Sequence, residues 1–312
     1  MLTRRGFIKG ATRLVMGGAL LGGYAVAGEP FRLSVTRYRV TPDDWPKGQH
    51  LRIAALADVH ACTPWMGPDR IARIVERTNG LGADLIVLLG DYTTGHRLTR
   101  QQVHSTVWAP ILGELSAPLG VHAVMGNHDW WEDRTAQKIG HGPTFGHRAL
   151  GAAGVNVLSN QAIKLPMGES GLWLAGLEDQ LALLPGHGGR RRKTGVDDLE
   201  GTLAGITDSA PAILLAHEPD VFPKVPARVA LTLSGHTHGG QVRLFGHSPI
   251  VPSRHGNRYA YGQVREADAA GKNRDLIVSG GLGCSILPVR FGMPPEIVVV
   301  DLEAPVPTKF RV

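Results

Sequence analysis

The sequence has few cysteines, few aromatic residues and few charged residues for its length. Only 2 of its 312 residues are cysteine, which excludes the multiple disulfides that stabilise small secreted domains. Aromatic residues make up 6% and charged residues 19%, whereas 43% are hydrophobic, and this balance excludes intrinsic disorder. The 41 glycines follow no three-residue period, so a collagen-like chain is excluded as well. The length fits one large α/β domain with a short extension.

Acidic residues are absent from residues 1–27, which contain four basic residues: Arg4, Arg5, Lys9 and Arg13. These account for four of the six net positive charges, so the basic composition indicates no nucleic-acid partner. An apolar stretch from Leu14 to Ala27 follows and ends in Ala25-Val26-Ala27, small residues at the positions that a signal peptidase reads. The stretch is about 14 residues long, shorter than a membrane-spanning helix.

This order of segments predicts a twin-arginine signal peptide over residues 1–27, or an N-terminal anchor if it is retained, and a domain over residues 28–312. We expect export by the twin-arginine translocation machinery to the periplasm or the outer face of the inner membrane. The alternative is an ordinary amphipathic helix. Export in the folded state fits Cys62 and Cys284, which we expect to be buried thiols.

The body of the chain alternates apolar runs with helical patterns. Pro68 opens a predicted helix, and others are expected over 100–115, over 134–153 with a break at Gly142-Pro143, and over 197–206. Predicted strands lie at 51–57, 85–89, 121–125, 156–158, 162–165, 172–177, 212–215, 229–233, 276–279 and 297–300. The pattern predicts an α/β fold, a four-layer α/β/β/α sandwich of two mixed β-sheets flanked by helices.

Side chains that can bind metal follow five of these apolar strands. They are Asp58 with His60, Asp91, Asn127 with His128, His217, and His236 with His238. Residues two apart in an extended segment point the same way, so both members of each D-x-H or H-x-H pair can face one site. Gly90, Gly126 and Gly235 precede them and permit positive φ or close approach. Eight such groups predict a dinuclear metal site at the strand ends.

The ordered set D-x-H, G-D, G-N-H-D, H and G-H-x-H resembles that of the calcineurin-like metallophosphoesterases. The resemblance runs from about Leu51 to Gln241, and family-like sequence continues to about Leu302. The tail Gly281-Leu282-Gly283-Cys284-Ser285 with Pro288-Val289-Arg290-Phe291 is similar to the exported, membrane-associated phosphodiesterase branch of that family.

The resemblance implies roles for the residues and two divalent cations as cofactors, with Mn, Fe, Zn or similar ions admitted by the mixed ligands. One ion would be held by three residues: Asp58, His60 and His238. The other would be held by a second set: Asn127, His217 and His236. Asp91 would bridge both, and His128 would face the substrate phosphate. The two cations would lower the pKa of water, and the resulting hydroxide would attack phosphorus.

The sequence departs from the family at Thr94, where many relatives have an aspartate that orients the catalytic histidine. His128 is therefore expected to rely on Asp129, a backbone group or water. Asp129 itself is interpreted as either a helix N-cap or that partner.

Several residues near the motifs have two interpretations each. Arg290 and Ser285 are candidate substrate contacts, and Arg290 equally fits an ion pair. Trp130 and Trp131 fit core packing or an apolar wall beside the substrate. The run Arg190–Lys193 fits a solvated loop or a grip on anionic headgroups.

The sequence thus predicts a metal-dependent phosphoesterase that hydrolyses phosphodiester or pyrophosphate-type bonds, with a substrate linked to a lipid or the envelope. A phosphomonoesterase is the alternative within the class. A non-catalytic envelope-binding protein with a vestigial metal site, and a hydrolase of carboxylic esters or amides, are the alternatives outside it.

Overall fold

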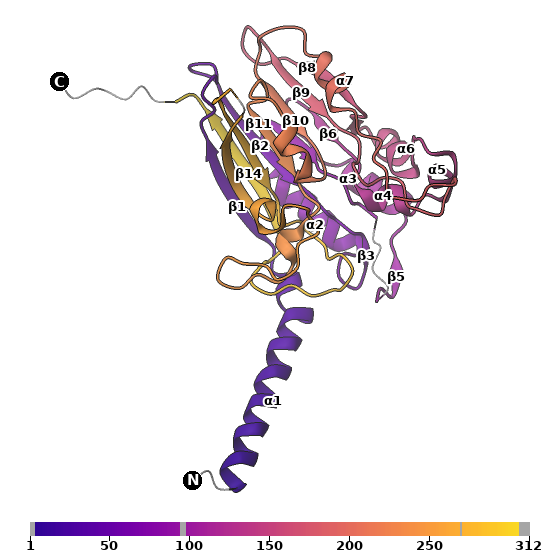
Figure 1. The fold of residues 1–312 in the computed structure, drawn as a ribbon, viewed down its shortest axis with the longest axis vertical. Helices are drawn as coiled ribbons and strands as arrows, with labels where there is room; N and C mark the ends of the chain where they lie inside the picture. Colours follow the sequence, from indigo (N-terminus) through magenta and orange to yellow (C-terminus); the bar gives the residue numbers. More distant parts are fainter. Residues whose placement is uncertain (1–3, 94–97, 269, 306–312) are drawn as a thin grey trace, which may run out of the picture.

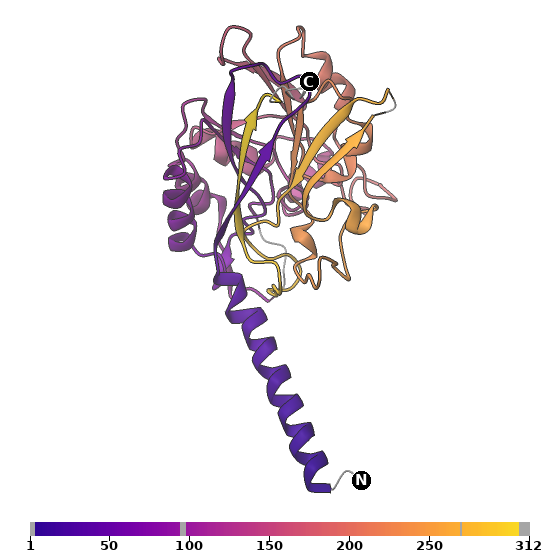
Figure 2. The same cartoon turned by 90° about the vertical axis from the view of Figure 1, so that its left-hand side faces the viewer.

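The computed structural model describes residues 4–93, 98–268 and 270–305. Its first element is helix α1 (Arg4–Ala27), which projects from one end of the body (Figures 1 and 2). In the described part of the chain, no helix combines the length and apolar character needed to cross a membrane. Export of the chain through residues 1–27 stays a prediction.

Six strands form a first, mixed sheet. Their spatial order is β1 (Ser34–Val40), β14 (Glu296–Glu303), β2 (His50–Leu56), β4 (Leu85–Leu88), β6 (Val121–Ala123) and β7 (Asn156–Val157). Strands β2, β4, β6 and β7 are parallel, whereas β14 runs antiparallel to β2. The central strand β4 reads LIVL and is buried throughout, because helices cover one face and a second sheet covers the other.

The second sheet is also mixed and six-stranded. Its order is β12 (Gly262–Ala267), β13 (Asn273–Val278), β11 (Leu231–Ser234), β10 (Ala212–Leu215), β9 (Leu172–Gly176) and β8 (Gln161–Leu165). The four inner strands are parallel, and β12 and β8 pair antiparallel at the edges. A small third sheet pairs β3 (Cys62–Thr63) with β5 (Gln101–Gln102).

The two large sheets pack face to face around a core that includes Ile53, Val87, Leu174, Ile213 and Leu233. The outer face of the first sheet is covered by α2 (Pro68–Asn79), α3 (Ser105–Leu112) and α6 (Phe145–Ala152). A thinner layer covers the second sheet, made of α7 (Leu199–Ala204) and the 3-10 helix η2 (Pro219–Lys224). The predicted four-layer sandwich is therefore confirmed (Figure 1).

Several elements differ from their predicted bounds. The helix expected over 100–115 covers only Ser105–Leu112, because β5 occupies its first turn and Pro110 lies in its last. The helix expected over 134–153 is broken as predicted, into α5 (Arg134–Ile139) and α6. Strands β1 and β12 and the short helix α4 (Asn127–Trp131) were not predicted. Three short 3-10 helices complete the fold: η1 (Glu29–Phe31), η3 (His238–Gly240) and η4 (Gly256–Tyr259).

Candidate metal centre

The eight predicted site residues meet at one edge of the sandwich. They follow the carboxyl ends of β2, β4 and β6 in one sheet and of β10 and β11 in the other. Parallel strands place their carboxyl ends at a common edge, so residues far apart in sequence become neighbours. Two groups of possible ligand atoms result, one with Asp58, His60 and His238, the other with Asp91, His217 and His236.

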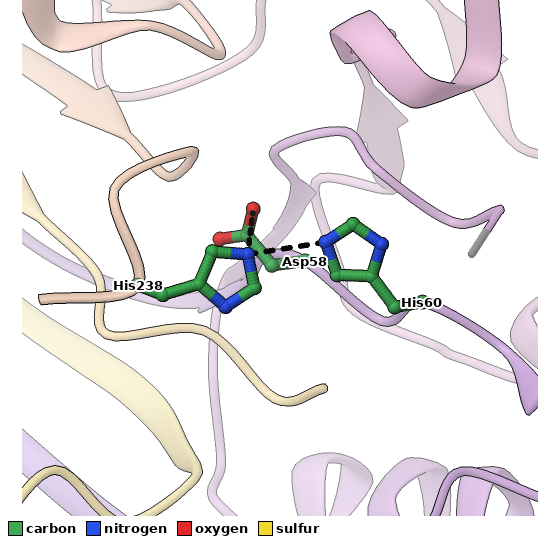
Figure 3. A group of neighbouring side chains, drawn as sticks. All are labelled: Asp58, His60 and His238. Atoms are coloured by element: carbon green, nitrogen blue, oxygen red, sulfur yellow. Dashed lines mark hydrogen bonds and ion pairs between the residues drawn. The ribbon is translucent and has the colours of Figure 1, made fainter. Parts of the chain in front are cut away.

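In the first group three side chains converge on one point (Figure 3). The Nε2 atoms of His60 and His238 lie 3.1 Å apart, and His238 Nε2 lies 3.3 Å from Asp58 Oδ1. His60 Nδ1 contacts the Thr93 carbonyl at 3.0 Å, which places the ring proton there and leaves a lone pair on Nε2. Burial lowers the pKa of His60 to about 3 and that of His238 well below its usual value. Two neutral rings whose Nε2 atoms lie this close to each other and to a carboxylate suit a cation between them.

The second group also joins imidazole nitrogens to a carboxylate. Here burial acts to lower the pKa of His217, but the Asp91 carboxylate outweighs it and raises that pKa well above its usual value. His217 Nδ1 contacts the Leu89 carbonyl at 2.6 Å, and its Nε2 lies 3.3 Å from Asp91 Oδ2. That Nε2 atom is buried without a hydrogen-bond partner. His236 Nε2 contacts the Pro252 carbonyl at 2.9 Å, so its Nδ1 carries the lone pair, 2.8 Å from Asn127 Oδ1. His236 Nδ1 and Asn127 Oδ1 are both acceptors, and together with the unpartnered Nε2 of His217 they fit a second cation.

Asp91 lies between the two groups. Its Oδ2 is 3.3 Å from His217 Nε2 and 3.6 Å from His60 Nε2, so one carboxylate reaches both. Burial acts to raise the pKa of Asp91, but His217, His128 and His60 outweigh it and hold the pKa well below its usual value. An ionised carboxylate in this position suits the bridging role that the resemblance implies.

The backbone at the site is strained. Nine non-glycine residues in the described part of the chain have positive φ, and five of them belong to the site: Asp58, His60, Asp91, His236 and His238. Each such residue costs of order 1–3 kcal/mol and persists only where its surroundings fix it, so a cluster of them marks a functional site.

Two glycines permit the close approach of the loops that carry the ligands. A Cβ on Gly126 would lie 2.3 Å from Asp91 Oδ1, and one on Gly90 would lie 2.6 Å from the Gly126 nitrogen. Gly90 also has a φ of +92°. The predicted role of these glycines is confirmed, because a side chain on Gly126 would displace Asp91 and one on Gly90 would collide with the Gly126 backbone and the His217 ring.

Asp129 organises the Asp91 loop and does not contact His128 through a hydrogen bond in the described structure. Its Oδ2 accepts the N–H groups of Asp91 (2.9 Å) and Gly126 (3.0 Å), and its Oδ1 accepts those of Tyr92 (3.0 Å) and Thr93 (3.1 Å). Burial and the charge of Asp91 raise the pKa of Asp129 to about 7, whereas these N–H groups lower it. Asp129 is therefore not the hydrogen-bond partner of His128 that the sequence suggested. Its carboxylate instead holds the backbone of the loop that carries Asp91.

His128 lies half-buried at the mouth of the site. Its backbone N–H donates to Asp91 Oδ1 at 2.8 Å, and its Nε2 lies 3.5 Å from the hydroxyl of Ser285. The indole of Trp131 packs 5.0 Å from its ring, and Lys193 Nζ lies 4.2 Å from the centre of that indole. Thr94, which bears on the orientation of His128, lies outside the described residues.

Trp130 and Trp131 have different environments. Trp130 is buried in the core and donates from Nε1 to Glu178 Oε2 at 3.1 Å. Trp131 is half-buried beside His128, so the apolar-wall interpretation applies to it alone.

Arg290 does not present its guanidinium to a substrate. It is fully buried and donates to the backbone carbonyls of Gly280, Gly283 and Met293, each at 2.9 Å. Its Nη2 also lies 3.3 Å from His238 Nδ1. The phosphate contact predicted for Arg290 is therefore corrected: this side chain holds the loop over the first ligand group.

A third group of possible ligand atoms was not predicted. It combines His217 with Asp179 and Glu218, both buried, and Asp179 Oδ2 and Glu218 Oε1 have no hydrogen-bond partner among the described residues. Burial and the charge of Glu218 raise the pKa of Asp179 well above its usual value. Asp179 follows strand β9 as the other acids follow their strands, so the same pattern would have found it.

Comparisons with known proteins agree with this geometry. The sequence profile described as Calcineurin-like phosphoesterase matches residues 51–240. The chain is 32% identical to the uncharacterized metallophosphoesterase YkuE of Bacillus subtilis, over 97% of this chain and 98% of that protein. It is 29% identical to an uncharacterized metallophosphoesterase of Aquifex aeolicus, over 91% and 97%. It is also 32% identical to a transmembrane protein with metallophosphoesterase domain of Danio rerio, over 62% of this chain and 41% of that protein. The chain therefore belongs to the calcineurin-like phosphoesterase family, whose members hydrolyse phosphoric esters.

Proposed function

We propose that the protein is a two-metal phosphodiesterase, with pyrophosphate-type bonds as the related substrate, and that it acts outside the cytoplasm. One observation carries the proposal: two groups of largely buried ligand atoms meet at Asp91, and the half-buried His128 lies directly beside that carboxylate. Two divalent cations bound there would polarise the phosphoryl oxygens and lower the pKa of water.

The chain's own residues supply the rest of the chemistry. Asp91 has both oxygens engaged, because Oδ2 faces His60 and His217 while Oδ1 accepts the N–H of His128. The backbone of His128 is thereby fixed relative to the carboxylate. Its ring stands at the mouth, where Nε2 can donate a proton to the leaving oxygen; such a transfer contributes typically ~10²–10⁴-fold in rate.

The surroundings favour a diester over a monoester. A monoester dianion carries one more negative charge than a diester, so its binding gains more from unpaired cations. The guanidinium of Arg290 contacts His238, but its N–H groups donate to backbone carbonyls, so it does not provide a cation for the phosphate. The half-buried indole of Trp131 lies between His128 and Lys193, where its exposed edge would contact the second ester group.

The deciding experiment compares hydrolysis of bis-p-nitrophenyl phosphate and p-nitrophenyl phosphate, with protein purified without chelator and with added Mn²⁺. We expect faster turnover of the diester and about two metal ions per chain. Asp91→Asn should abolish turnover while the protein stays folded. Cleavage of the monoester alone would show a phosphomonoesterase. If the wild-type protein contains no metal and hydrolyses neither compound, the result would favour the envelope-binding alternative.

The site of action is tested separately through the N-terminal pair Arg4 and Arg5. We expect the double substitution Arg4→Lys with Arg5→Lys to keep the protein in the cytoplasm, as judged by fractionation. An unchanged distribution between compartments would contradict export by the twin-arginine route.

A further inference from the structure

Two loops near the metal centre expose large apolar side chains. Phe245 is 107% exposed, Ile250 80% and Ile286 73%, and Leu244 and Leu287 are also exposed. We call these five residues the apolar rim. Phe245 and Ile286 also have positive φ, at 52° and 61°. For a bulky or β-branched residue this backbone conformation is an outlier, so the fold accepts strain at the two residues that reach furthest into solvent.

The rim residues belong to one continuous surface. The backbone N–H of Arg243 donates to the Phe291 carbonyl at 2.8 Å, which joins the loop of Phe245 to the loop of Ile286. The side chain of Gln241 strengthens this junction, because it donates to the Leu287 carbonyl at 3.2 Å and accepts from the Ser285 N–H at 2.6 Å. Ser285, which precedes Ile286, contacts His128. The rim therefore borders the mouth of the metal centre.

Helix α1 emerges from the same surface. The backbone N–H of Arg290 donates to the Ala25 carbonyl at 2.9 Å, and the ring of Tyr24 packs edge-on against Phe291. In Figures 1 and 2 the orange and yellow loops surround the base of α1 at that end of the body. The helix exposes apolar side chains around its circumference: Leu14, Val15, Met16, Leu20 and Leu21. Its apolar surface thus continues that of the rim.

The charges around the rim suit an anionic surface. Residues 241–260 and 280–294 contain no aspartate or glutamate, and neither does α1, which carries four basic residues towards its amino end. Arg243, which precedes Leu244 and Phe245, has no carboxylate partner among the described residues, whereas Arg254 and Arg258 pair with Asp220 and Glu266. Apolar side chains beside an unpaired basic residue are a pattern of segments that insert into the interface of an anionic bilayer. A protein partner is less well matched, because the rim consists of separate protruding side chains on two loop tips.

We propose that the apolar rim docks on a phospholipid bilayer, with Phe245 and Ile286 inserted among the lipids beside α1. Docked in this way, His128 and Ser285 face the headgroup layer, so the substrate would be a phosphodiester or pyrophosphate carried on a lipid. The identity of the substrate rests on the proposed function, whereas the docking itself does not.

The test places an environment-sensitive fluorophore on the full-length protein at Phe245→Cys. Labelling is selective because the native thiols of Cys62 and Cys284 are buried. The matched control is Ile139→Cys, since Ile139 is 51% exposed on α5, which lies away from the base of α1 in Figure 1. With vesicles of phosphatidylglycerol and phosphatidylethanolamine, we expect the emission at position 245 to rise severalfold and shift to the blue, and that at 139 to stay unchanged.

The label separates docking of the rim from binding through α1 alone. If the protein sediments with vesicles but the label at 245 stays as hydrated as that at 139, only α1 binds and the proposal is overturned. Absence of vesicle binding overturns it as well. As a second measure, Phe245→Ser should weaken vesicle binding about tenfold, and Ile139→Ser should not. Failure of the wild-type protein to cleave soluble diesters would refute the proposed function and leave the fluorescence result intact.

Discussion

The hydrogen bonds of Asp129 give the sharpest prediction about how the metal centre is held. Its carboxylate accepts four backbone N–H groups from two loops and is fully buried. In Asp129→Asn one side-chain oxygen remains and an NH₂ group replaces the other. Two of the four backbone N–H groups therefore lose their acceptor and lie against the NH₂ group, which is itself a donor. A hydrogen bond to a charged group contributes about 1.5–3 kcal/mol, and the loss is therefore about 3–6 kcal/mol.

That loss is large compared with the whole free energy of unfolding of a domain, about 5–15 kcal/mol. It falls on the loop that carries Asp91, so metal content should fall together with stability. We expect urea denaturation of the chelator-treated variant to shift to clearly lower concentrations. Metal analysis of the untreated variant should find fewer ions per chain than in the parent.

Asp133→Asn is the matched control. The Asp133 side chain is also buried and accepts three backbone N–H groups, from Thr135, Ala136 and Phe145, but it caps α5 away from the metal ligands. Its substitution removes one hydrogen bond, about 1.5–3 kcal/mol, and should leave the metal content unchanged. If Asp129→Asn unfolds like the parent and keeps its metal, the reasoning about this carboxylate is refuted.

Three further predictions concern neighbouring residues. Gly126→Ala should lose metal and more than about 10²-fold in activity, because the added Cβ would lie 2.3 Å from Asp91 Oδ1. The control is Gly151→Ala, which should behave as the wild-type protein because no atom lies within 4 Å of its added Cβ. Arg290→Met should destabilise the protein by at least about 3 kcal/mol in urea denaturation, since three buried carbonyls would each lose a donor at about 1–3 kcal/mol apiece. An unchanged midpoint would contradict its holding role. His128→Asn should lower kcat for the diester about 10²–10⁴-fold at unchanged metal content, and a loss of metal instead would make His128 a ligand.

The sequence was sufficient to predict the layers and the convergence of the candidate ligand side chains at one edge of the sandwich. Both follow from strongly apolar strands such as 85–89 that end abruptly in polar residues. The edge strands β1 (SVTRYRV) and β12 (GQVREA) were missed because polar and charged residues interrupt any apolar run, and only one residue of each strand is fully buried.

The roles of the supporting residues were harder to predict than the ligands. Arg290 near a metal site is chemically suited to phosphate, and only its burial and its carbonyl partners show that it binds the backbone. Asp129 likewise follows the candidate catalytic histidine in sequence, whereas its acceptors are used by residues 36 to 38 positions earlier and by Gly126. Such contacts depend on how loops cross in space, which spacing along the chain does not determine.

Backbone strain explains why these supports matter as much as the ligands. Five site residues with positive φ, at about 1–3 kcal/mol each, together cost about 5–15 kcal/mol, as much as the net stability of a whole domain. The ligand loops therefore cannot keep this shape through their own conformational preferences. They are held by the carboxylate of Asp129, the guanidinium of Arg290 and the side-chain-free surface of Gly126. A chain with all the ligands but without these three residues would possess the motif and lack the metal centre.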